Sequence, residues 1–149
     1  MNPERYFSSE EKERIVDALK KAELQTTGEI RVHIENRCAG NVLDRGAWVF
    51  KKLRMHHTKE RNGVLFFVAL TDRKFAVLGD TAINRRIPST FWNDMKLTME
   101  KYFIAGNITE GITEGIRMAG EQMKTHFPRQ AGDINELPDE ISFGKEENA

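Results

Sequence analysis

An apolar run from Gly63 to Leu70 is the feature that most constrains the fold of this chain. The run is rich in Val and Phe and is short enough for a β-strand. Because successive residues are apolar, both faces of this strand should be covered. The apolar pattern stops at Thr71–Arg73 and resumes from Phe75 to Leu78, which predicts a β-hairpin.

The composition indicates one soluble domain with an appended tail. The 149 residues are 39% hydrophobic and 31% charged, which is typical of a globular protein. We expect a single domain over residues 1–128 and an acidic C-terminal tail, solvated or loosely docked, over residues 129–149. Lys plus Arg and Asp plus Glu number 23 each, so no overall field favours nucleic acid or an acidic membrane as a partner.

Targeting and redox features favour a cytoplasmic protein. The first residues lack the apolar core of a signal peptide, and no segment is apolar over the length of a membrane span. The single cysteine, Cys38, excludes an internal disulfide and a zinc knuckle.

The chain before the hairpin predicts helix, strand, helix in that order. Ser8–Glu11 matches a capping box, and apolar residues at helical spacing follow it, so a helix should run from Ser9 to Leu24. Glu29–Glu35 alternates strictly and predicts a strand with one apolar and one polar face. A second helix should bury a stripe that the following residues form: Leu43, Ala47, Phe50 and Leu53.

These elements predict an α/β fold in which a mixed sheet is sandwiched between helices (α/β/α). A strand, helix, strand order implies a right-handed crossover, which makes the strand at Glu29 parallel to the strand at Gly63. The hairpin then adds an antiparallel neighbour. After the hairpin we expect a short helical turn at Thr81–Arg86 and two helices. The last helix carries Gly111 and Gly115, a spacing that indicates close backbone packing.

This topology predicts a polar site at one rim of the sheet. Two parallel strands begin there and the antiparallel strand ends there, so widely separated residues should become neighbours: Thr27, Glu29, Arg61, Asn62 and Asp80. Two carboxylates, an amide and backbone carbonyl oxygens exposed beside glycines are ligands that suit Ca²⁺. Arg61 could instead neutralise Glu29 or hold a phosphate. A salt-bridge cluster without any ligand is the third interpretation.

Other candidate chemistries are weaker. Cys38 and Arg45 resemble a phosphate-binding thiol loop, but six residues separate them where that motif has five. His56 and His57 are adjacent, so their side chains should diverge and remain in solvent. No nucleophile elbow or serine, histidine, aspartate arrangement can be identified.

Four segments together resemble the TPM domain family, over roughly residues 7 to 128. They are Phe7 to Glu11 with Thr27–Val32, Thr58 to Leu65, Asp72–Ala76 with Gly79 and Asp80, and Phe91 and Trp92 with Gly106 to Ile116. The resemblance implies a mixed sheet between helices. A plant thylakoid member is regarded as an acid phosphatase that assists photosystem II repair, and family members bind calcium in an acidic pocket at the end of the sheet.

The positions that match the family's acidic pocket are Glu29 and Asp80, with Arg61 and Asn62 alongside. We expect Glu29, Asp80, Asn62 and Thr27 to be the metal ligands, and Arg61 and Asp80 are the candidate catalytic residues. Asp72 is a further acidic motif position, but the topology places it at the far end of the sheet. In a phosphatase, Arg61 would orient a small phosphorylated substrate for attack by water that the ion activates. In the alternative, a non-catalytic adaptor, calcium would order the rim for a protein partner. Neither nucleic-acid binding nor a membrane span is expected.

Overall fold

The computed structural model describes residues 2–130, 132 and 139–144 of the chain. Its α-helices are α1 (Ser9–Glu23), α2 (Val42–Lys52), α3 (Thr81–Arg86), α4 (Ser89–Ile104) and α5 (Ile108–His126). Its strands are β1 (Glu29–Glu35), β2 (Gly63–Ala69), β3 (Lys74–Gly79) and β4 (Ile141–Phe143), and two 3₁₀ turns span η1 (Pro3–Tyr6) and η2 (Met55–His57).

The strands form one mixed sheet in the order β3-β2-β1-β4. β1 and β2 are parallel, with Glu29 paired to Gly63, and β2 and β3 are antiparallel, with Val64 paired to Gly79. The predicted crossover and hairpin are therefore confirmed. β1, β2 and β3 begin and end within one residue of the expected positions, because alternation and the polar break mark them clearly.

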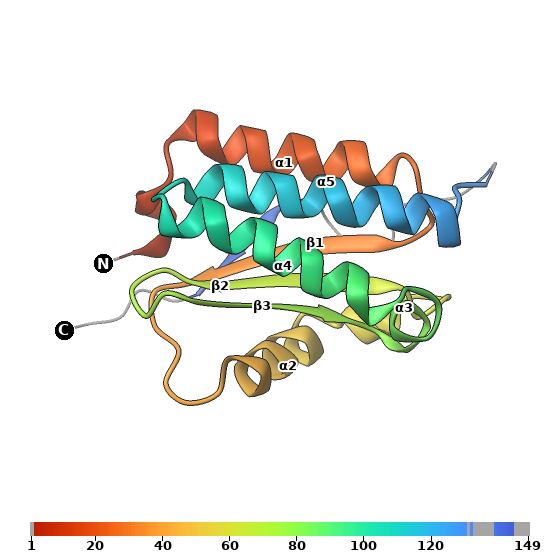
Figure 1. The fold of residues 1–149 in the computed structure, drawn as a ribbon, viewed down its shortest axis with the longest axis horizontal. Coiled ribbons are helices and arrows are strands. Elements are labelled where there is room, and N and C mark those ends of the chain that lie inside the picture. Colours follow the sequence, from red (N-terminus) through yellow and green to blue (C-terminus); the bar gives the residue numbers. More distant parts are fainter. Residues whose placement is uncertain (1, 131, 133–138, 145–149) are drawn as a thin grey trace.

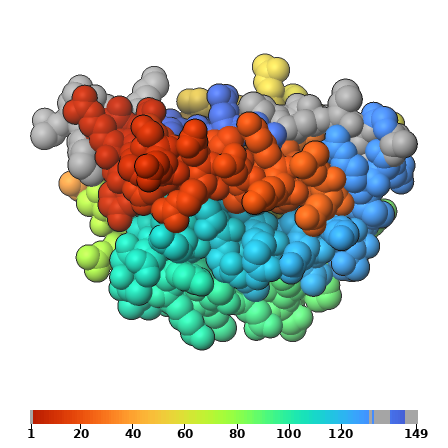
Figure 2. Space-filling model, turned by 90° about the horizontal axis from the view of Figure 1, so that it is seen from above, coloured from red at the N-terminus to blue at the C-terminus, as the bar shows by residue number. Residues whose placement is uncertain are grey.

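Helices cover both faces of the sheet, as the α/β/α prediction requires. α1, α4 and α5 lie on one face and α2 lies on the other (Figure 1). Seen from above, the three helices pack side by side over the sheet (Figure 2). Across the described residues, no helix is both long and apolar enough to cross a lipid bilayer.

β2 is buried along its whole length, which confirms the prediction from its apolar run. Alternate residues of β2 contribute to two cores. Val64, Phe66 and Val68 pack in the core beneath α1, α4 and α5, and Leu65 and Phe67 pack in a smaller core beneath α2. The central strand is thus fixed from both sides by apolar contact.

The predicted buried stripe of α2 is correct for Phe50 and Leu53, which pack against the smaller core, and wrong for Leu43 and Ala47. Leu43 and Ala47 are exposed, whereas Gly46 and Val49 are buried. Gly46 faces Leu78 so closely that an added Cβ atom would lie 2.6 Å from the Leu78 methyl carbon. The helix therefore turns its glycine toward β3 and leaves two apolar side chains in solvent.

The glycines of α5 pack closely, as predicted. A Cβ atom on Gly111 would lie 2.5 Å from the Phe103 ring, and one on Gly115 would lie 2.6 Å from the Met99 sulfur. The capping box at Ser8 is present, with Ser8 accepting from the Glu11 amide. The Asn107 side chain, at the start of α5, makes no capping hydrogen bond.

The segment after residue 128 contains a strand that sequence analysis did not predict. Ile141–Phe143 forms β4, which pairs in parallel with Val32–Ile34 of β1. This part of the tail is therefore built into the sheet rather than solvated. Residues 131, 133–138 and 145–149 lie outside the described structure, so the expectation of a loose acidic tail stays a prediction there.

Candidate functional site at the rim of the sheet

The start of β1, the start of β2 and the end of β3 lie together at one rim of the sheet. The Glu29 amide, at the start of β1, donates to the Asn62 carbonyl at 3.4 Å, and the Asp80 amide, just after β3, donates to the Gly63 carbonyl at 2.9 Å. The lead-in to β2 is therefore hydrogen-bonded to both of its neighbours. The rim residues are brought together as the topology predicts.

Arg61 and Asp80 form a two-point ion pair at this rim. Arg61 Nε lies 2.7 Å from Asp80 Oδ2, and Arg61 Nη2 lies 2.8 Å from Asp80 Oδ1. Asp80 is buried, and its Oδ1 also accepts from the Thr81 amide at 2.7 Å, which caps α3. The hydrogen bonds to Asp80 raise the pKa of Arg61 above its usual value. Asp80 thus already has two partners.

Asn62 occupies the centre of the rim and has one unsatisfied oxygen. Its Nδ2 group donates to Thr27 Oγ1 at 3.1 Å, while its Oδ1 atom is buried and receives no hydrogen bond from the described residues. The hydroxyl oxygen of Thr58, four residues earlier, is also buried and makes no hydrogen bond to the described residues. A buried acceptor without a donor is destabilising, so each of these oxygens calls for a cation or a water molecule.

Glu29 is almost fully buried and lies on the polar face of β1, two strands away from Asp80. Strands are spaced about 4.8 Å apart, so the two backbone positions are separated by about 10 Å.

Glu23 lies next to this rim and was missed by sequence analysis. Its Oε1 atom accepts from the Ile30 amide at 2.9 Å, and the side chain is buried. Burial, followed by a hydrogen bond with Asp139 and the charge of Glu29, raises the pKa of Glu23 to about 10. The sequence does contain one indication of this burial. Glu23 follows Leu19 by four residues, so both side chains lie on the buried face of α1.

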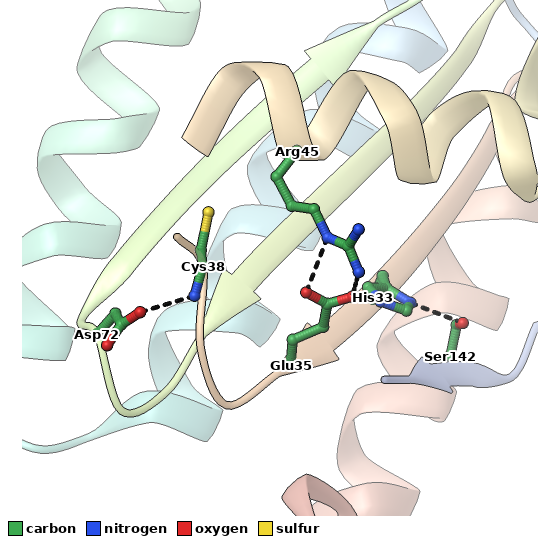
Figure 3. Close-up of polar contacts among 6 residues, drawn as sticks. All are labelled: His33, Glu35, Cys38, Arg45, Asp72 and Ser142. Atoms are coloured by element: carbon green, nitrogen blue, oxygen red, sulfur yellow. Dashed lines mark hydrogen bonds and ion pairs between the residues drawn. The ribbon is translucent and has the colours of Figure 1, made fainter. Parts of the chain in front are cut away.

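The opposite end of β1 carries a second polar cluster, which sequence analysis also missed (Figure 3). His33 Nδ1 lies 2.7 Å from Ser142 Oγ, and His33 Nε2 lies 3.0 Å from Glu35 Oε1. Arg45 reaches down from α2 and contacts Glu35 at 2.6 Å and 3.1 Å. The chain of contacts fastens β4 and α2 to β1, although β4 lies more than a hundred residues away in sequence.

Electrostatics in this cluster keep Glu35 ionised. Burial alone would raise the pKa of Glu35, but hydrogen bonds from His33 and Arg45 outweigh it and lower the pKa to about 2. An ionised Glu35 carboxylate accepts a hydrogen bond from the N–H at His33 Nε2, while His33 Nδ1 and the Ser142 hydroxyl form the second hydrogen bond of the ring.

The remaining candidate residues, Cys38, Asp72, His56 and His57, belong neither to the rim nor to the cluster around Glu35. Cys38 is buried, and its amide donates to Asp72 Oδ2 at 2.7 Å, so Asp72 lies at the far end of the sheet as expected. His57 is exposed and His56 is partly so, but the two rings contact each other with their centroids 4.1 Å apart, so the prediction that these side chains diverge is wrong. Among the described residues, no group of three or more His, Cys, Asp and Glu side chains is placed to hold a metal ion. A metal at the rim would therefore need amide or hydroxyl oxygens as well.

Comparison with known proteins places the chain near a protein family and a solved structure. A family model described as the TPM domain matches residues 1–122. The NMR structure of the BA42 protein from the psychrophilic bacterium Bizionia argentinensis superposes with a TM-score of 0.89 at 41% sequence identity, covering 93% of this chain and 96% of that one. Comparison with curated proteins gives no match.

Proposed function

The chain belongs to the TPM domain family, and from that premise we propose that it binds a divalent cation, calcium, at the rim of the sheet. The ligands would be Glu29, Asp80, Asn62 and Thr27. The observation that carries the proposal is the buried Asn62 Oδ1 atom, which lacks a donor among the described residues and lies at the centre of a rim with two buried carboxyl groups. Calcium takes oxygen ligands of mixed type in flexible geometry.

Arg61 acts as a competitor for the ion in this proposal. Its guanidinium group occupies both oxygens of Asp80, so a cation that takes Asp80 must displace it. The Arg61 side chain is 48% exposed and can move into solvent without burying its charge. Calcium affinity should therefore be modest, and removing the Arg61 side chain should increase it.

Hydrolysis of phosphomonoesters is the enzymatic form of the proposal. Displacement of Arg61 would free a planar, two-pronged donor beside the ion, which is the geometry that binds phosphate. Arg61 would then orient the phosphate, and the ion would supply positive charge that stabilises the transferred group. In the adaptor form, the same displacement would reorganise the exposed surface around Arg61 for a protein partner.

Calorimetric titration with calcium tests the shared premise. We expect binding in the millimolar range or tighter, loss of binding in Asp80→Asn, and tighter binding in Arg61→Ala. Asp72→Asn is the matched control, because it removes a carboxylate at the far end of the sheet and should leave the affinity unchanged. Absence of binding at millimolar calcium, or equal loss in Asp72→Asn and Asp80→Asn, would remove the proposal.

A phosphomonoesterase assay separates the two forms. Turnover that depends on calcium and is lost in Arg61→Ala, a variant that still binds the ion, supports the enzyme. Ion binding without turnover, together with NMR shift changes confined to the residues around Arg61, supports the adaptor.

A further inference from the structure

The balanced charge of the whole chain conceals a strongly basic segment. Residues 37–61 contain seven Lys or Arg residues and two Asp or Glu residues, although the complete chain has a formal charge of zero. Two of the seven, Arg45 and Arg61, pair with Glu35 and Asp80 outside the segment, and the other five give it a net charge of +3. The segment comprises α2, η2 and their flanking loops. α2, whose last turn carries Lys51 and Lys52, lies on the face of the sheet opposite to α1, α4 and α5 (Figure 1).

The outward face of α2 combines apolar and cationic side chains. Leu43 and Trp48 are 53% and 49% exposed, and Lys51, Lys52 and Arg54 are exposed beside them. These five residues, together with the exposed Ala47, form what we call the α2 face. Asp44 is the one acidic residue within the helix. Such a helix is polar and basic with exposed apolar anchors, a composition typical of interfacial helices.

Two cations hold the exposed indole ring in place. The Arg45 guanidinium, one turn before, lies 4.3 Å from the centre of the Trp48 ring, and the Lys52 ammonium, one turn after, lies 4.7 Å from it. Cation–π contacts of this kind keep the positive charges next to the aromatic ring on the protein surface. Tryptophan flanked by basic residues is favoured at the boundary between lipid headgroups and acyl chains.

We propose that the α2 face docks on an anionic phospholipid surface, with Leu43 and Trp48 entering the headgroup layer and the lysines binding lipid phosphates. The charge of the segment is complementary to that surface. A nucleic acid would also match the charge, but exposed Leu43 and Ala47 add nothing to a row of phosphate contacts, whereas they gain from contact with acyl chains. The docking surface is separate from the proposed cation ligands at the rim.

Vesicle sedimentation at low salt tests this proposal. The full chain should sediment with vesicles of phosphatidylcholine mixed with phosphatidylglycerol, should not sediment with phosphatidylcholine alone, and should be released by added salt. Lys51→Glu with Lys52→Glu should weaken binding by at least about tenfold. The matched control is Lys20→Glu with Lys21→Glu, because those exposed lysines end α1 on the opposite side of the sheet just as Lys51 and Lys52 end α2.

Fluorescence provides a second measurement that does not depend on charge. In Trp92→Phe, Trp48 is the remaining tryptophan, and its emission should shift to shorter wavelength on binding mixed vesicles. A lack of sedimentation at low salt, equal weakening in both double variants, or an unshifted emission in the bound state would overturn the proposal. Tight binding of a DNA duplex through Lys51 and Lys52 without vesicle binding would overturn it in favour of a nucleic acid.

Discussion

Arg61 and Asp80 lie nineteen residues apart in sequence and form a two-point ion pair in which the carboxylate is buried and the guanidinium is half exposed. The asymmetry matters for stability. If the exposed partner is lost, a buried charge remains unpaired, whereas if the buried partner is lost, only a solvated arginine remains.

Arg61→Ala should therefore destabilise the fold more than Asp80→Asn. Asparagine retains the oxygen that caps α3 at Thr81, while Asp80→Ala removes it and should cost a further ~1 kcal/mol. Urea unfolding of the three variants checks the order. Arg117→Ala, which breaks an exposed pair with Glu114, is the control and should have little effect. A loss in Asp80→Asn that exceeds the loss in Arg61→Ala would contradict this account.

Glu23→Gln should stabilise the protein at neutral and alkaline pH. The pKa of Glu23 is raised to about 10, so the folded protein keeps a proton that the unfolded chain releases near pH 4.5. Stability should therefore fall as the pH rises from about 5 to 10, by up to ~1.4 kcal/mol per pH unit.

Glutamine retains an acceptor for the Ile30 amide and does not titrate, so the advantage of Glu23→Gln should grow with pH. Denaturant unfolding at several pH values between 5 and 9 measures it. A difference from the unmodified protein that does not vary with pH would show that Glu23 is ionised in the folded state.

Glu35→Gln should make the free energy of unfolding depend less on pH below about pH 5. The pKa of Glu35 is lowered to about 2, so its favourable contribution is complete above the unfolded pKa and is lost as the pH falls from about 5 to 2. Allowing for the partial exposure of Arg45, we expect that contribution to be about 2 kcal/mol.

Unfolding experiments between pH 3 and 6 provide the measurement for Glu35→Gln. Glu114→Gln is the control, because its arginine partner is more exposed than Arg45. An acid limb as steep in Glu35→Gln as in the unmodified protein would refute the assignment.

Gly120→Ala should destabilise the contact between α1 and α5. An added Cβ atom would lie 2.8 Å from the Ala22 Cβ and 3.2 Å from its Cα, which cannot move without shifting the helix. The strain of overpacking, about 1–3 kcal/mol, should exceed the roughly 1 kcal/mol that alanine gains over glycine in a helix. Thermal unfolding measures the result, and Thr125→Ala at an exposed position of α5 should be nearly neutral.

The sequence was sufficient to predict β1, β2, β3 and their arrangement, because their patterns are local and topology rules do the rest. It failed where two patterns compete. In α2, Leu43 and Ala47 match a helical stripe as well as Gly46 and Val49 do, and only the packing of Leu78 decides between them. It also failed where the partner is distant, since β4 has three residues and acquires its strand structure from β1.

The candidate site likewise has features that topology predicts and features that depend on side-chain packing. The convergence of Glu29, Asn62 and Asp80 on one rim is a property of topology and could be predicted. The pairing of Arg61 with Asp80 rather than with Glu29 depends on side-chain geometry that no spacing encodes. Glu23 was missed because a charged residue at the end of a helix is normally assigned to solvent.

The position of Glu23 also bears on self-association. Among the described residues, β4 pairs with β1 at Val32–Ile34, and the Ile30 amide lies on the same edge of β1. The Glu23 carboxyl occupies that amide from within the same chain. A strand of a neighbouring molecule that approached β1 at Ile30 would find this amide already hydrogen-bonded, so the protein should resist strand-mediated aggregation at that position.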